Sequence, residues 1–410
     1  MMGGRMRALT NARIICPVHG ERTGTVLFQG DRILAVGPVD VPADAETIDA
    51  RGRIVAPALV DLGVFAMDKA ACRAGGIARI GLMPDQSPVL DGPGIIQRAA
   101  AMGKPELWVH PIAAATAGLM GADLAEMGIA AEAGARAVAT GRAWIADSGV
   151  MRKVLSYARD CGLTVLSHAE DGGLAQGAAA TEGLTATLLG LPAAPAVAEA
   201  LAIARDLMLA EALDAAIHFR VVSTEQGIAL VRAAKARGVR VTCGTTPAHI
   251  LLSDIAMSDY RTFAHLSPPL RSEADRLATR AAIADGTIDV LCSSHDPRGP
   301  EEKRLPFADS APGMAGAETL LTLALSLVRD GVVSMPRLFA LLASEPARVL
   351  GLESGVIAPD MPADLIVVDP DAPWIVDADA LAGRAGNTPF DGLPVQGKVL
   401  HLFKGGAPIA

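Results

Sequence analysis

Two short polar runs contain the residue types that enzymes use for metal binding and proton transfer. His168 and Glu170 occur in LSHAED, and His295 and Asp296 occur in SSHDPR. Imidazole nitrogens and carboxylate oxygens are ligands of hydrolytic zinc, and the same groups exchange protons with substrates near neutral pH. These side chains therefore predict either a metal centre or an acid–base pair, provided that the fold brings the two runs together.

Each group also has a purely structural interpretation. His168 could simply be hydrogen-bonded to a neighbour, and Glu170 suits a helix N-terminus, where the helix dipole favours an acid. His295 and Asp296 need a third partner to act as a catalytic pair, and the sequence shows none. Cys292 could form a thiol nucleophile with His295, but a buried strand cysteine is the simpler interpretation.

The elements that position these residues alternate between apolar β-rich runs and Ala-rich helical runs. Eight strands with intervening helices predict a (β/α)8 TIM-like barrel, in which chemistry occurs at the carboxyl ends of the strands. The predicted strands are Leu59–Val64, Ala78–Met83, Leu107–Ala113, Ala135–Ala139, Thr164–His168, Ile217–Ser223, Val239–Thr245 and Ile288–Ser294. The predicted helices are Gly94–Met102, Ala122–Ala133, Val150–Cys161, Ala196–Leu213, Glu225–Arg237 and Glu273–Asp285.

The two ends of the chain have a different pattern, with short apolar runs between turn residues. ARIICPV, GTVLFQG and DRILAVG near the N-terminus each read as a strand, as do LIVVDPD and GKVLHLF near the C-terminus. We expect residues 1–56 and 351–410 to form one small β-sandwich, with the barrel of residues 57–350 inserted in it. The predicted fold class is α/β.

Composition excludes several functions. The 410 residues carry a net charge of −9 without a run of Lys or Arg, which argues against nucleic-acid binding. The most apolar helical run, Leu320–Val328, is too short to span a bilayer, and the N-terminal residues lack the apolar stretch of a signal peptide. Five scattered cysteines without a C-x-x-C motif indicate reduced thiols. We therefore expect a cytoplasmic protein that does not bind membranes.

Several ordered stretches resemble the dihydroorotase branch of the amidohydrolase superfamily. The family's Met-Pro-Asn-Thr turn is similar to MPDQ, its strand-five histidine motif to LSHAED, and its strand-eight Asp-Val-x-x-Thr-Asp-His-Ala-Pro-His motif to DVLCSSHDPR. TTPAHILLSD, LSPPLR, GMAGAETLL, EPARVLGLE, MPADLIVVDP and NTPFDGLPV extend the similarity to the C-terminal part. The resemblance spans nearly the whole chain and implies the barrel fold, whereas activity depends on the site.

The resemblance also implies what the site should contain. Family members use zinc to activate a water molecule, and strand one carries H-x-H followed by a substrate-binding arginine. Gly63, Phe65 and Met67 stand at those three positions, and of the metal ligands only His168 remains. The degenerate site implied by the resemblance comprises Gly63, Phe65, Met67, Asp85, Thr140, His168, Val221, Ser294, His295 and Arg298.

Three hypotheses follow. The first is a non-catalytic dihydroorotase homologue without a cofactor, which the resemblance pairs with aspartate carbamoyltransferase in pyrimidine biosynthesis; we also expect a homo-oligomer. The second is an active dihydroorotase or related cyclic-amide hydrolase, with zinc held by His168, Glu170, His295 and Asp296. The third is a metal-free barrel that binds a small anion through Arg142 or Arg298.

Overall fold

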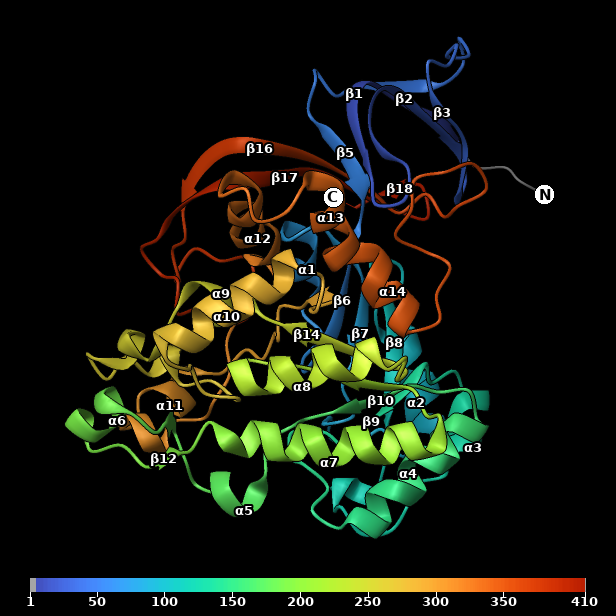
Figure 1. The fold of residues 1–410 in the computed structure, drawn as a ribbon. Helices are drawn as coiled ribbons and strands as arrows, with labels where there is room; N and C mark the ends of the chain where they lie inside the picture. Colours follow the sequence, from blue (N-terminus) through green and yellow to red (C-terminus); the bar gives the residue numbers. More distant parts are fainter. Residues whose placement is uncertain (1–4, 410) are drawn as a thin grey trace.

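The computed structural model describes residues 5–409, so residues 1–4 and 410 of the predicted terminal module lie outside the described part. One of its two eight-stranded sheets consists of parallel strands that follow one another in chain order around a barrel (Figure 1). They are β6 (Leu59–Val64), β7 (Ile77–Leu82), β8 (Trp108–Ala114), β9 (Ala137–Ala139), β10 (Val165–Ser167), β13 (Ile217–Phe219), β14 (Val241–Thr245) and β15 (Val290–Leu291). The barrel prediction is therefore confirmed.

Helices cover the outside of the barrel, and the predicted ones form close to their expected positions. They are α2 (Pro93–Met102), α3 (Met127–Glu132), α4 (Ser148–Asp160), α7 (Val197–Leu213), α8 (Glu225–Ala236) and α10 (Glu273–Ala284). Caps visible in the sequence begin several of them: the side chains of Asp147, Thr224 and Ser272 accept the backbone N–H groups at the starts of α4, α8 and α10. Their apolar faces pack on the outward side chains of the strands in one large core cluster.

Hydrogen bonds at the strand ends join the first and last barrel strands. The backbone N–H of Phe65, just after β6, donates to the carbonyl of His295 at 2.9 Å. Within β6 itself, the carboxylate of Asp61 accepts the backbone N–H of Ser293 at 2.9 Å and also the Ser293 hydroxyl. Asp61 is fully buried, and its carboxylate links the first barrel strand to the segment that follows the last one. We call this junction the barrel seam.

The two chain ends combine into one strand-rich sheet, as predicted, and its strands curve around their own apolar core. Its strands are β1 (Met6–Cys16), β2 (Gly20–Gln29), β3 (Arg32–Gly37), β4 (Glu46–Asp49), β5 (Ile54–Pro57), β16 (Leu365–Ile375), β17 (Pro394–Lys404) and β18 (Ala407–Pro408). β16 pairs antiparallel with β5, which links the C-terminal strands to the N-terminal ones. The domain limits at residues 56/57 and 350/351 stay a prediction.

The terminal sheet lies across one end of the molecule, with α12 (Leu320–Arg329) and α13 (Met335–Phe339) between it and the barrel (Figure 1). Shorter elements complete the fold. They are α1 (Lys69–Ala74), α5 (Gly172–Ala175), α6 (Leu184–Leu189), α9 (Pro247–Leu251), α11 (Pro300–Lys303), α14 (Glu345–Val349), β11 (Ala180–Thr181) and β12 (Ala193–Ala194). Four short 3-10 turns, η1 (Ala117–Leu119), η2 (Asp254–Met257), η3 (Thr262–Ala264) and η4 (Phe307–Asp309), and the π-helical η5 (Ala340–Ser344) are also present.

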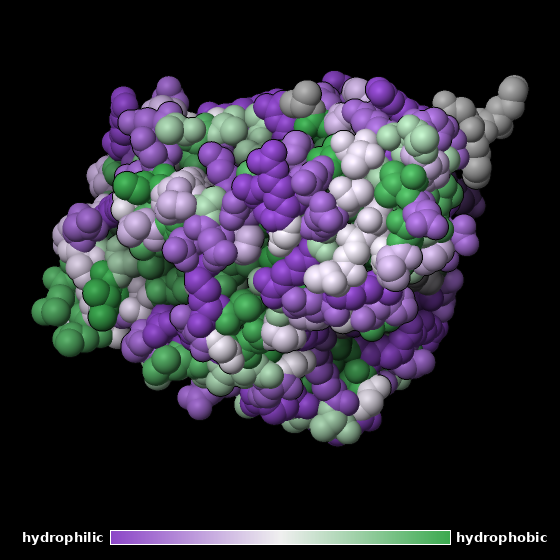
Figure 2. Space-filling view, turned by 90° about the horizontal axis from the view of Figure 1, so that it is seen from above, coloured by the Kyte–Doolittle hydropathy of each residue, from purple (hydrophilic) through white to green (hydrophobic). Residues whose placement is uncertain are grey.

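The surface is mostly hydrophilic, with an apolar group at one edge. Leu184 and Leu188 of α6 are about three-quarters exposed, and Ile255 of η2, which contacts α6, is largely exposed too. Figure 2 shows hydrophobic residues gathered at the left, the side on which Figure 1 places α6. Within residues 5–409, no helix is both long enough and apolar enough to cross a bilayer.

Candidate functional site

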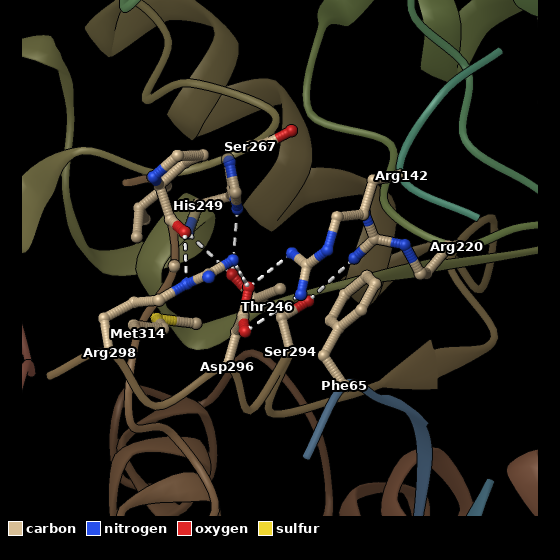
Figure 3. Close-up of a pocket in the computed structure, with 13 residues that line it drawn as sticks. Phe65, Arg142, Arg220, Thr246, His249, Ser267, Ser294, Asp296, Arg298 and Met314 are labelled. Atoms are coloured by element: carbon tan, nitrogen blue, oxygen red, sulfur yellow. Dashed lines mark hydrogen bonds and ion pairs between the residues drawn. The ribbon is translucent and has the colours of Figure 1, made fainter. Parts of the chain in front are cut away.

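A cavity of about 280 Å³ opens at the carboxyl ends of the barrel strands (Figure 3). Its lining residues follow β6, β9, β13, β14 and β15 in the sequence, together with residues of two later loops. They are Phe65, Arg142, Arg220, Thr246, His249, Leu266, Ser267, Ser294, Asp296, Arg298, Pro312, Gly313 and Met314. The cavity therefore occupies the place at which a barrel of this kind carries its chemistry.

Two arginines pack against one aromatic ring in this cavity. The guanidinium carbon of Arg142 lies 3.9 Å from the centre of the Phe65 ring, and that of Arg220 lies 4.9 Å from it. Cations over an aromatic face are attracted by its quadrupole. Phe65 stands at the predicted position of the second strand-one histidine, and here it supports two cations.

Arg220 is the functional residue that the sequence analysis missed. It is 2% exposed, and its Nη1 donates to Ser294 Oγ at 3.1 Å while Nη2 donates to His168 Nδ1 at 3.2 Å. A Cβ added at Gly63 would stand 3.2 Å from Arg220 Cδ. Arg220 therefore fills the space next to the first predicted ligand position on strand one.

A signal for Arg220 was present in the spacing of strand six. His218 pairs in register with Thr242 on β14 and with Leu166 on β10. Leu166 belongs to the cluster of buried residues inside the barrel, so His218 points inward too. Side chains two residues apart on a strand share a face, so Arg220 is expected to point inward like His218. Val221 also joins the interior cluster, because β13 ends at Phe219 and the alternation stops there.

A buried chain of charged groups continues from Arg220. Because arginine has no acceptor, His168 Nδ1 must accept from it, and His168 Nε2 lies 3.6 Å from a Glu170 oxygen. Glu170 also pairs with Arg271 at 3.2 Å, and Arg271 lies 3.5 Å from Glu199. Burial acts to raise the pKa of Glu170, but the hydrogen bond with His168 and the charge of Arg271 lower it to about 2. Both nitrogens of His168 therefore have protein partners.

Asp296 is paired with two arginines of the cavity. Arg142 contacts it through two nitrogens, at 2.5 and 3.0 Å, and Arg298 Nη2 donates to it at 2.9 Å. Arg298 also pairs with Glu302 at 3.0 Å. Arg142 and Arg298, the two residues proposed from the sequence to bind an anion, thus already have carboxylate partners.

His295 points away from the cavity. Its Nδ1 accepts the backbone N–H of Ala317 at 3.3 Å, and its Nε2 lies 4.0 Å from Asp68. Burial lowers the pKa of His295 to about 4, although the negative charges of Asp68 and Asp296 act to raise it. His295 and Asp296 therefore do not form the acid–base pair considered from the sequence, since Asp296 binds arginines on the other side.

The remaining positions of the predicted site have structural partners. Asp85 accepts the backbone N–H of Arg142 at 3.0 Å, and burial raises its pKa. Thr140 accepts the backbone N–H of His168 at 3.0 Å, and Met67 packs at the edge of the outer core. Burial, with a contribution from the charge of Asp61, raises the pKa of Cys292 to about 11, so its thiol is not an activated nucleophile.

The residues present do not suit a zinc site. Within residues 5–409, no group of three or more His, Cys, Asp or Glu side chains lies together in a way that could hold a metal ion. Of the four alternative ligands, His168 and Glu170 contact each other, whereas His295 and Asp296 turn to separate partners. Because a hydrolytic zinc needs about three protein ligands, the donor set does not fit the metal.

The comparisons with known proteins agree with the fold. L-hydantoinase (dihydropyrimidinase) from Arthrobacter aurescens superposes with a TM-score of 0.88 at 23% identity, covering 98% of this chain and 95% of that one. A dihydropyrimidinase from Brevibacillus agri gives 0.84 at 21% identity, covering 99% and 95%. At these identities the similarity concerns the fold alone.

Sequence relatives are more similar. A protein named dihydroorotase from Geobacter metallireducens is 38% identical over 97% of this chain and 98% of its own length. Another from Syntrophotalea carbinolica is 39% identical over 96% of each chain. The model of the Amidohydrolase family matches residues 122–409. The chain therefore belongs to the amidohydrolase family, and proteins named dihydroorotase are among its homologues.

Proposed function

We propose that this chain is a dihydroorotase-family protein of pyrimidine biosynthesis with a degenerate metal site, and that it is a non-catalytic subunit supporting aspartate carbamoyltransferase. Relatives named dihydroorotase match over nearly the full length, which supports the family role. The carbamoyltransferase partner, a homo-oligomeric state and a cytoplasmic location are further parts of the proposal.

The position of Arg220 carries the non-catalytic part of the proposal. Its guanidinium is positively charged and lies beside the strand-end cavity, where it uses the Nδ1 lone pair of His168. A divalent cation there would face this positive charge and a histidine whose acceptor nitrogen is already bonded. Gly63 provides no ligand, and a Cβ at this position would stand only 3.2 Å from Arg220 Cδ.

Loss of the metal ligands is compatible with a stable barrel. Phe65 and Val221 belong to the same buried cluster as Val60, Leu62 and Leu166 in the barrel interior. Apolar groups at former ligand positions extend this core, and removal of clustered polar ligands commonly favours stability. A barrel of this kind can serve as a scaffold for a partner, because core residues and site residues are different sets.

Elemental analysis and an activity assay on one purified sample test the catalytic part. We expect less than about one zinc per ten chains and no hydrolysis of dihydroorotate, because a stable site needs about three ligands. The Geobacter metallireducens relative, assayed in parallel, controls for assay conditions. Near-stoichiometric zinc with turnover would overturn the proposal and favour the alternative of an active hydrolase with atypical ligands.

The partner is tested separately. Purified chain and aspartate carbamoyltransferase from the same organism are mixed, and their masses are measured by size-exclusion chromatography with light scattering. We expect one co-eluting species heavier than either component, and a multiple of 42.0 kDa for the chain alone. Independent elution at concentrations of tens of micromolar contradicts the subunit role, and a 42.0 kDa species contradicts the homo-oligomer.

A further inference from the structure

We propose that a second copy of this chain packs on the outward face of α7, with a two-fold axis passing close to Ala204. The inference rests on the homo-oligomer of the proposed function and names its interface. It requires neither a metal nor catalytic activity. The face lies on the outside of the barrel (Figure 1), and the residues that line the strand-end cavity come from other elements.

α7 is apolar on its outward face as well as on the face that meets the barrel. Val197, Leu201 and Met208 are 40, 49 and 71% exposed. Ala204 and Ala212 continue the same stripe at helical spacing and are also accessible. A surface helix of a soluble protein normally turns a polar face to water, and a helix that is apolar all round is normally buried. The outward face of α7 therefore has the character of a contact surface.

The charges that border this stripe are already paired within the chain. Arg205 contacts Asp206 at 2.5 Å, and Glu211 pairs with Arg237 of α8 at 2.9 Å. Neither Arg205 nor Glu211 is therefore available to select a partner of opposite charge. Because the chain carries a net charge of −9, two copies repel each other over most of their surfaces. A face with balanced charges is where like copies approach with the least repulsion.

The neighbouring helices provide the area that a stable dimer needs. α4 and α8 flank α7 (Figure 1), and Arg159 of α4 donates to the carbonyl of Leu213 at 3.1 Å. The three helices have 13, 17 and 12 residues. Side by side they present a face of about 20–25 Å by 25–30 Å, or roughly 500–750 Å². This footprint approaches the ~800 Å² per partner of a typical stable interface.

The composition of the face also fits an interface. The apolar stripe lies in the middle, and the exposed charged residues of α4 and α8 lie on either side of it. Protein interfaces commonly have such an apolar centre and polar rim. The apolar group at α6 is less suitable, because that helix has six residues and is only about 9 Å long.

The stripe is suited to pairing with a copy of itself. A two-fold contact is self-complementary, so residues on one side of the axis meet their counterparts from the other side. Leu201 and Met208 lie at similar distances on the two sides of Ala204, and Val197 and Ala212 lie further out. An antiparallel crossing at Ala204 brings Leu201 of each copy against Met208 of the other. The small side chain of Ala204 allows the helix axes to approach to about 8 Å.

Substitutions on the stripe test the interface in the full-length protein by size-exclusion chromatography with light scattering. We expect wild type to have the mass of at least two chains of 42.0 kDa. Leu201→Glu/Met208→Glu should be a monomer at about 10 µM, which corresponds to at least a hundredfold increase in Kd. Leu188→Glu, at the exposed apolar group of α6, is the matched control and should keep the wild-type mass. Circular dichroism checks folding, and Met208→Glu alone replaces the double variant where that does not fold.

The outcomes separate this inference from the proposed function. A wild type of 42.0 kDa contradicts the homo-oligomer and this inference with it. An oligomeric wild type with an equally heavy double variant overturns the α7 interface and leaves the homo-oligomer standing. A double variant that stays oligomeric but no longer co-elutes with aspartate carbamoyltransferase assigns the face to that partner, and this also overturns the inference.

A disulfide locates the crossing point. Cys161 is partly exposed and the other four cysteines are buried, so Cys161→Ser provides the background. In it, Ala204→Cys should form an intermolecular disulfide on mild oxidation, because Cα atoms within about 7 Å of each other can be bridged. Ala212→Cys lies about 12 Å further along α7, and in an antiparallel crossing its two copies are too far apart. Non-reducing gels give the readout. Cross-linking at Ala212 that equals or exceeds that at Ala204, or cross-linking at neither position, contradicts the proposed axis.

Discussion

Gly63 and Arg220 lie so close together that the identity of one determines what the other can be. Gly63 has a φ of +86°, a conformation that favours glycine, and the methylene groups of Arg220 approach the place where its Cβ would be. A side chain at position 63 would therefore press against the Arg220 side chain, which would have to shift by a few tenths of an ångström. The missing ligand and the buried arginine are thus one coupled change.

This coupling can be measured with Gly63→Ala. We expect a destabilisation of about 2–5 kcal/mol, because left-handed strain of ~1–2 kcal/mol adds to overpacking of ~1–3 kcal/mol. In an Arg220→Ala background the overpacking disappears, and the cost of Gly63→Ala should fall to about 1–2 kcal/mol. Urea unfolding of the four proteins gives both values. Equal costs in the two backgrounds would show that the residues are not coupled.

The sequence located the emptied ligand positions but not the residue that fills the space. Gly63, Phe65 and His168 were found because they stand in recognisable runs. Arg220 is missed because the sixth strand is predicted to continue to Ser223 with Val221 as its site position, and on a continuous strand the neighbouring residue points the other way. Where a strand ends depends on which backbone groups find partners, and those partners are distant in sequence. A contact such as that between Gly63 and Arg220 is therefore visible only in three dimensions.

At the scale of elements, the strand ends and helix starts are held by buried carboxylates that periodicity does not reveal. The helices were predicted closely, because their apolar spacing and capping residues are local signals. The last barrel strand was predicted as Ile288–Ser294 but is limited to Val290–Leu291. After Leu291 the backbone N–H of Cys292 still donates to the Thr245 carbonyl, and at Ser293 the chain is held by the Asp61 carboxylate instead of by a regular ladder.

Asp61 makes the barrel seam sensitive to pH. Burial raises its pKa from 3.8 to about 6, although hydrogen bonds from Ser293 act to lower it. The folded state therefore binds a proton more tightly than the unfolded state does. The resulting stabilisation is fully present below about pH 4 and is lost as the pH rises through about 6.

Asp61→Asn removes this titration while keeping the size of the side chain. We expect the stability of the variant relative to wild type to increase between pH 4.5 and 7.5, by an amount on the order of a few kcal/mol. Unfolding free energies at four pH values provide the measurement. A difference that does not change with pH would mean that Asp61 has the same proton affinity in both states.

Glu199 of α7 anchors the start of α8. It is fully buried and accepts the backbone N–H groups and the hydroxyl groups of Ser223 and Thr224. We expect Glu199→Ala to cost about 3–5 kcal/mol, since several buried donors lose a charged acceptor. Glu211→Ala, which removes an exposed partner of Arg237 from the same helix, should cost less than ~1 kcal/mol. Thermal denaturation of both variants makes the comparison, and similar losses would contradict the anchoring role.

At the scale of the whole molecule, the terminal sheet and the barrel share one core. Ile54 of β5 and Leu402 of β17 belong to the same buried cluster as Leu325 of α12 and Ile77 of β7. Across the same junction, Trp108 of the barrel donates to Asp364 at 3.3 Å. The sequence correctly assigned both chain ends to one module, but their burial against the barrel depends on side chains that meet only after folding.

The shared core predicts that the two parts unfold together. The fluorescence of Trp108 reports on the junction between the sheet and the barrel. Trp144 reports on the barrel alone, where the guanidinium carbon of Arg205 lies 3.6 Å from its ring centre. The double variant Trp144→Phe/Trp374→Phe keeps only Trp108, and the double variant Trp108→Phe/Trp374→Phe keeps only Trp144. Because separating the sheet would expose apolar surface on both sides, we expect the two fluorescence transitions to have the same midpoint, which should also equal that of far-UV circular dichroism. A lower midpoint at Trp108 would show that the sheet detaches first and that the predicted domain limits mark independent folding units.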